Sequence, residues 1–215
     1  MRKTFDAELQ ELNEEMTTMA AAAQEAIDVV TESLTSGDEP TAYRAIQIEA
    51  TLDQMERDIE NHCLRLLLRQ QPVARDLRTI STAMKMVTDL QRIGDQAANI
   101  AEISILLARG EQIRVPEDIS LMSRRAGIMV KQAIAAYTAR DTDMASAVIN
   151  LDDEVDELFS RIKGEMIECI AANREHADQA IDLMIITKYL ERIADHAVNI
   201  AQWAIFCVTG QLIKT

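Results

Sequence analysis

The stretch that decides the fold is Gln91-Arg-Ile-Gly-Asp-Gln-Ala-Ala-Asn-Ile-Ala-Glu102. It returns one hundred residues later as Glu191-Arg-Ile-Ala-Asp-His-Ala-Val-Asn-Ile-Ala-Gln202, with seven of the twelve positions identical. An internal repeat of this kind indicates that a chain is built from copies of one structural unit. The sequence therefore predicts two homologous units in tandem.

A second pair of segments extends the repeat toward the N-terminal side. Ile48-Glu49-Ala50-Thr51-Leu52-Asp53 aligns with Leu151-Asp152-Asp153-Glu154-Val155-Asp156 at an offset of 103, against 100 for the opening stretch. The difference of three residues between the two offsets fits a short insertion in a loop, where insertions are tolerated. We place the two repeats at residues 1–110 and 111–215.

The composition predicts an all-α protein. Apolar residues make up 48% of the 215 positions, and only six Gly and three Pro interrupt long runs of good helix formers. Apolar residues recur at steps of three and four, as on the buried face of a helix. The sequence predicts three helices per repeat, packed as two bundles either along each other or end to end, with breaks at Gly37, Gln70–Pro72, Gly110–Pro116, Arg140–Asp141 and Asn173.

The charge and the cysteines limit the classes of function. A formal charge of −14 disfavours binding to nucleic acid or to an anionic membrane and favours cations or basic partners. Three separated cysteines without a CxxC motif are typical of buried thiols in a reducing cytoplasm. The chain begins without the apolar core of a signal peptide and holds no run approaching the roughly 20 apolar residues of a spanning helix, so we expect a cytoplasmic protein.

Acidic and amide side chains recur at steps of four on the second and third predicted helices, which aligns them on one helical face. The second helices carry the pairs Glu49 with Asp53 and Asp152 with Asp156. The third helices carry Gln91, Asp95 and Asn99, then Glu191, Asp195 and Asn199.

These stripes continue faces that are apolar upstream, since Met84 precedes Gln91 by seven residues and Met184 precedes Glu191 by seven. Burying unpaired carboxylates is costly, so a positive group should neutralise them. Arg92 and Arg192 lie one helical step, about 100°, away from the stripes. A metal ion is the other candidate, and oxygen ligands suit magnesium, manganese or iron. The alternative is that the stripes are solvated faces paired with Arg and Lys.

Signals for catalysis are missing from the sequence. His196 follows Asp195, but the matching residue is Gln96, which favours a surface or supporting role over a metal ligand. The HxxxH and ExxH patterns of zinc or di-iron enzymes do not occur, nor does a Gly-rich phosphate loop. No Ser, Cys or Thr has a recognisable nucleophile setting.

The two third-helix motifs and the acidic pairs upstream resemble the PhoU family of phosphate-uptake regulators over nearly the whole chain. The resemblance implies a negative regulator of high-affinity phosphate uptake and of phosphate-starvation signalling. It implies a cytoplasmic homodimer, peripheral to the membrane only through its partners, which are the ATPase subunit of the phosphate ABC transporter and a sensor histidine kinase. It also implies iron or zinc clusters held by Glu49, Asp53, Asp95, Asp152, Asp156, Glu191 and Asp195, with Gln91, Asn99 and Asn199 as additional polar contacts.

One residue departs from the family pattern, because Gln91 stands where a carboxylate is usual. We therefore expect a weaker metal site in the first repeat. Two other functions remain open on the residues alone. Clustered carboxylates would suit a metalloenzyme acting on phosphate esters, and long amphipathic helices suffice for a chaperone or assembly adaptor.

Overall fold

The computed structural model describes residues 2–70, 72–109 and 114–212 and is all-α, as predicted. No strand occurs in these ranges. The helices are α1 (Arg2–Ser36), α2 (Glu39–Gln70), α3 (Ala74–Ala108), α4 (Glu117–Ala139), α5 (Thr142–Ala172) and α6 (Ala177–Thr209), with a short 3-10 turn, η1 (Arg174–His176), before the last.

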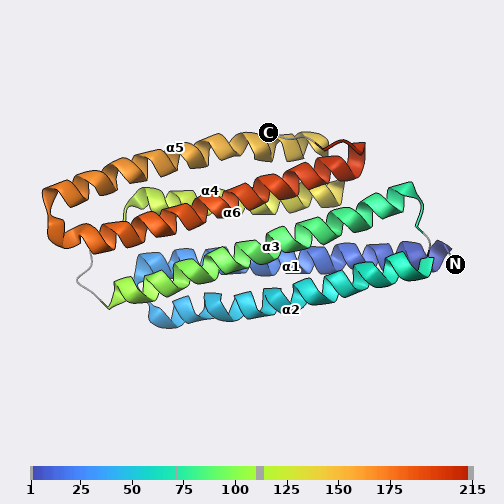
Figure 1. Cartoon of the computed structure of the whole chain (residues 1–215), viewed down its shortest axis with the longest axis horizontal. Coiled ribbons are helices and arrows are strands. Elements are labelled where there is room, and N and C mark those ends of the chain that lie inside the picture. The colour runs from blue at the N-terminus through green and yellow to red at the C-terminus, as the bar shows by residue number, and fades with distance from the viewer. Residues whose placement is uncertain (1, 71, 110–113, 213–215) are drawn as a thin grey trace.

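The two predicted bundles lie side by side rather than end to end (Figure 1). Helices α1, α2 and α3 form the first bundle and α4, α5 and α6 the second. Helix α3 packs along α6, and α1 packs along α4, so the first and third helices of each repeat make the contact between bundles. One hydrophobic core runs through both bundles.

The helix boundaries follow the local signals in the sequence. Gly37 takes the left-handed conformation (φ 69°) directly after α1, which suits the residue without a Cβ. Asp38 then caps α2, since its Oδ2 accepts from the backbone N–H of Thr41 at 2.9 Å. Asp141 caps α5 in the same way, accepting from the backbone N–H of Asp143 and Met144.

Some boundaries differ from prediction or fall outside the described residues. The Asn173 side chain accepts from the backbone N–H of Glu175 and turns the chain into η1, so the break predicted at Asn173 extends to His176 and α6 begins at Ala177. The predicted repeat boundary at 110/111, with Gly110 as the end of α3, and the middle of the turn at 70–72 lie outside the described residues.

The cysteine prediction is wrong at one position. Cys63 and Cys207 are buried, whereas Cys169 is only partly buried near the end of α5, because fewer helices cover that end of the hairpin. No helix in the described part of the chain is both long and apolar enough to cross a membrane.

Candidate metal centre

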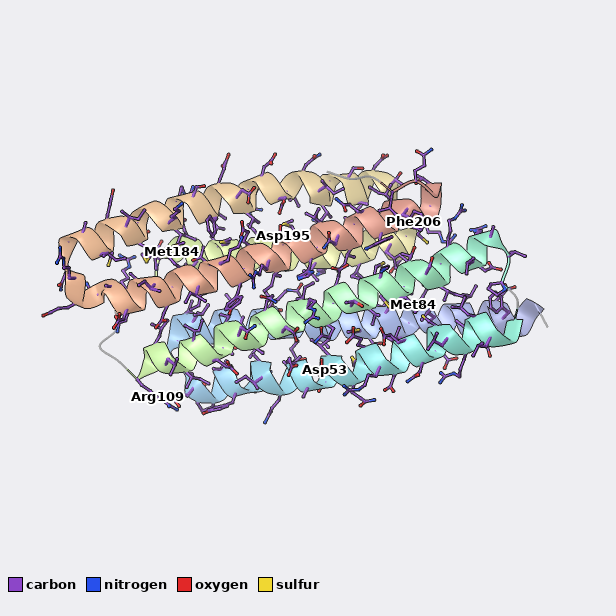
Figure 2. All side chains as sticks on the ribbon, viewed as in Figure 1. Asp53, Met84, Arg109, Met184, Asp195 and Phe206 are labelled. Atoms are coloured by element: carbon purple, nitrogen blue, oxygen red, sulfur yellow. The ribbon has the colours of Figure 1, made fainter. Side chains whose placement is uncertain are left out.

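The first repeat brings three carboxylates together on the outer face of α2 and α3. Glu49 and Asp53 lie one turn apart on α2, and Asp95 faces them from α3. One oxygen from each lies within 4.8 Å of the others, and all three side chains are partly buried. Figure 2 labels Asp53 in this region, together with Asp195 of the second repeat. We call these three residues the first acidic cluster.

Gln91 joins the two aspartates of this cluster. Its Nε2 donates to Asp53 Oδ1 at 2.8 Å and to Asp95 Oδ1 at 2.7 Å. The side chain is nearly buried, at 8% exposure, as its near-core position on the helix predicts. The amide therefore bridges α2 and α3 where a third-helix carboxylate would repel both partners.

Arginines supply part of the positive charge. Arg92 Nη1 donates to Asp95 Oδ2 at 2.8 Å, because residues three apart on a helix are neighbours. Arg57 Nη1 lies 4.0 Å from Asp53 Oδ2. Glu49 has no such partner in the described part of the chain. Its pKa is raised by burial first and then by the charges of Asp53 and Asp95.

The donor set of the first acidic cluster fits a hard or borderline cation. Three carboxylates from two helices supply oxygen ligands, and Glu49 has no basic partner among the described residues. Gln91 presents its nitrogen to the aspartates in this arrangement, so the three carboxylates are the ligands that the geometry provides.

The corresponding carboxylates of the second repeat are more dispersed. Asp156 and Asp195 are exposed, and Glu191 is paired with Lys188 on the same helix. Burial, followed by the charges of Asp156, Asp195 and Asp153, raises the pKa of Asp152 to about 6. Among the described residues, the first acidic cluster is the one group of three or more acidic, His or Cys side chains with ligand atoms within 4.8 Å.

The structure separates Asn199 from these carboxylates. Asn199 Nδ2 donates to Asp89 Oδ1 at 3.2 Å, and His196 Nδ1 lies 2.9 Å from the same oxygen, so α6 is tied to α3. Asn99 is partly buried on α3. Asp89 is not among the predicted site residues, yet its side chain is only 14% exposed. Local sequence holds no signal for this contact, because Asp89 and His196 are 107 residues apart and lie on different helices.

The fold and the site define a class of protein: a duplicated three-helix scaffold with an acidic cluster between the second and third helices of its first repeat. Two segments of the chain match the PhoU domain, residues 16–104 and 119–204, one in each bundle. The chain belongs to the PhoU family, as the sequence motifs predicted.

Relatives match the chain over nearly its full length. One from Clostridium acetobutylicum is 35% identical over 99% of this chain and 97% of its own length. Another from Aquifex aeolicus is 38% identical over 96% of this chain and 94% of its own. Both are named phosphate-specific transport system accessory protein PhoU homolog.

Solved structures share the fold. PhoU from Pseudomonas aeruginosa superposes with a TM-score of 0.92 at 31% identity, covering 96% of this chain and 100% of that one. The phosphate transport system regulatory protein PhoU from Streptococcus pneumoniae superposes with a TM-score of 0.91 at 26% identity, covering 98% and 100%.

Proposed function

We propose that this protein is a cytoplasmic negative regulator of high-affinity phosphate uptake and of phosphate-starvation signalling. The names of its relatives, accessory and regulatory proteins of phosphate transport, support this function. The protein acts by contact and not by catalysis. As a homodimer, it binds the ATPase subunit of a phosphate ABC transporter, a sensor histidine kinase, or both.

The observation that carries the mechanism is the convergence of Glu49, Asp53 and Asp95 within 4.8 Å. These residues hold a divalent or trivalent cation, with iron, zinc or manganese as candidates. The second repeat holds a further ion through Asp152, Asp156, Glu191 and Asp195. A bound ion supplies positive charge at the surface and lets a carboxylate or phosphate of a partner approach an otherwise repulsive acidic face.

Elemental analysis of protein purified without chelator or affinity metal tests the metal site. The wild type is compared with Asp53→Asn/Asp95→Asn and with the control Asp58→Asn/Glu102→Gln, which alters two exposed carboxylates on the same helices. We expect at least one ion per chain in the wild type and the control and a clear loss in the cluster variant. Wild-type protein that stays empty and cannot be loaded with manganese, iron or zinc contradicts the metal proposal alone.

Regulation is tested separately in a host strain from which the gene is deleted. Phosphate uptake and a phosphate-starvation reporter are measured in phosphate-rich medium, and cross-linked complexes are recovered through the tagged protein. We expect uptake and reporter output to rise in the deletion strain and to fall again when the wild type is restored. Unchanged uptake and reporter output, with neither a transporter ATPase nor a sensor kinase in the complexes, would overturn the proposed function.

A further inference from the structure

The turn between α2 and α3 exposes large apolar side chains. Leu64 and Leu68 lie in the last turns of α2, and Val73 and Leu77 lie at the start of α3. Leu68 is 84% exposed, and the other three are about half exposed. Figure 1 places this turn at one end of the long axis, beside the start of α1. We call these four residues with Arg65, Arg75 and Arg78 the α2–α3 tip.

The charge of the α2–α3 tip differs from that of the protein. The described side chains from Leu64 to Arg78 include three arginines against the single carboxylate of Asp76, whereas the whole chain has a formal charge of −14. Arg65 and Arg75 are exposed and form no ion pair in the described part of the chain. Glu8 and Glu11 share a small hollow with Arg65, whereas Arg75 does not line that hollow.

The second repeat provides an internal comparison. The turn between α5 and α6 lies at the opposite end of the molecule (Figure 1), and Ile167 and Ile181 are exposed on it to a similar extent. Between these two residues the chain carries one arginine against three carboxylates, namely Arg174, Glu168, Glu175 and Asp178. Both ends therefore expose apolar side chains, four at the α2–α3 tip and two beside the α5–α6 turn, and they differ in the sign of their charge.

Exposed leucines beside unpaired arginines fit an anionic phospholipid surface. Apolar side chains enter the boundary between headgroups and acyl chains. The charged ends of arginines stay in the hydrated headgroup layer, where they contact the phosphates. The leucines project from a helical turn at an end of the molecule, which suits a soft surface better than a rigid partner groove. Glu8 and Glu11 of α1 lie beside Arg65, so Arg75 supplies the positive charge that meets the phosphates.

We propose that the α2–α3 tip docks the protein directly on a membrane surface that contains anionic phospholipid. This contact adds to attachment through partners and does not depend on the metal site or on the regulatory function. It also gives the elongated molecule one orientation, with the α5–α6 turn directed away from the membrane.

Vesicle co-sedimentation of the full chain tests the proposal. The probes are vesicles of pure phosphatidylcholine and vesicles that also contain phosphatidylglycerol. We expect binding to the anionic vesicles that falls on the order of tenfold in Leu68→Ser/Leu77→Ser and about fivefold in Arg75→Gln. The matched control Ile167→Ser/Ile181→Ser, at the acidic end, should bind like the wild type. Circular dichroism confirms that these surface variants stay folded.

A tryptophan probe reports which end enters the lipid. In a Trp203→Phe background, Leu68→Trp should be quenched by brominated phospholipid and Ile167→Trp should not. Three results would each overturn the proposal: equal sedimentation with both kinds of vesicle, an equal loss in the Ile167→Ser/Ile181→Ser control, or no loss in Leu68→Ser/Leu77→Ser. Capture of an acidic protein by the tip without vesicle binding would also contradict it.

Discussion

At the scale of single residues, Gln91 decides how the first acidic cluster is held. Its amide donates to two aspartates on different helices, whereas its counterpart in the second repeat, Glu191, pairs with Lys188. A neutral donor stabilises the metal-free arrangement, because hydrogen bonds to a charged acceptor are strong. Because Gln91 is an amide that donates to both aspartates, it does not supply the metal ligand that a carboxylate at this position would supply.

Changing Gln91→Glu should therefore separate the metal-free and metal-bound states. Without metal, we expect a loss of about 2–3 kcal/mol in the free energy of unfolding, because two charge-assisted hydrogen bonds become repulsions. With added manganese, the variant should gain more stability than the wild type. Urea unfolding with chelator or with manganese measures both effects. Equal stability of the two proteins in chelator would contradict the bridging role.

Asp152 makes stability depend on pH. Its pKa is raised to about 6 in the folded protein by burial and by neighbouring carboxylates. Between pH 4 and 6 the folded state keeps a proton that the unfolded state has lost, so this group's contribution to stability falls as pH rises through that range and is lost above it.

We expect Asp152→Asn to stabilise the protein by about 1 kcal/mol at pH 7.5 in chelator, a figure reduced for solvent screening. The gain should vanish below about pH 3, where Asp152 is protonated in both states. Thermal unfolding at the two pH values measures the difference, and Glu165→Gln, at an exposed position on the same helix, is the control. A gain of the same size at both values would rule out this linkage.

At the scale of the elements, the contact between the second and third helices is packed with different residues in the two repeats. A Cβ on Gly94 of α3 would stand 2.5 Å from Leu52 Cδ1 of α2, and both residues are buried. At the matching positions the second repeat has Ala194 and the smaller Val155, also buried. The volume of the residue on the second helix therefore compensates for that on the third.

A double-mutant cycle tests this compensation. Gly94→Ala alone should cost about 1–2 kcal/mol, because overpacking exceeds the gain in helix propensity. Leu52→Val alone should cost about 1 kcal/mol. The double variant should lose only about 1 kcal/mol, because a favourable coupling of about 1–2 kcal/mol offsets most of the summed losses in urea unfolding. Additive losses would show that the two positions do not share this space.

At the scale of the whole molecule, the bundles are joined by a common core and by a polar contact. The core continues across the contact of α3 with α6 and of α1 with α4. Asp89 accepts from Asn199 across it and lies 2.9 Å from His196. The two repeats should therefore unfold together.

Calorimetry should show one transition, with the calorimetric and van't Hoff enthalpies in agreement. Asp89→Ala leaves two polar partners unpaired and should cost about 2 kcal/mol, which lowers Tm by about 4–8 °C in a chain of this size while the transition stays single. Glu102→Gln, at an exposed position, is the control. Two resolved transitions in the wild type would mean that each repeat unfolds independently.

The sequence by itself determined the all-α class, the duplication and most helix ends, because these depend on local properties such as apolar periodicity, glycine at left-handed positions and capping aspartates. It also placed Glu49 with Asp53 on one helical face, since a spacing of four residues does so on any α-helix. Which carboxylates converge depended on the tertiary structure. Asp95 and Asp195 occupy matching positions, yet Asp95 joins a cluster and Asp195 is exposed. The relative placement of two helices, the contact of Gln91 with Asp53 and the contact of Asp89 with His196 join segments distant in the chain, and local sequence does not encode them.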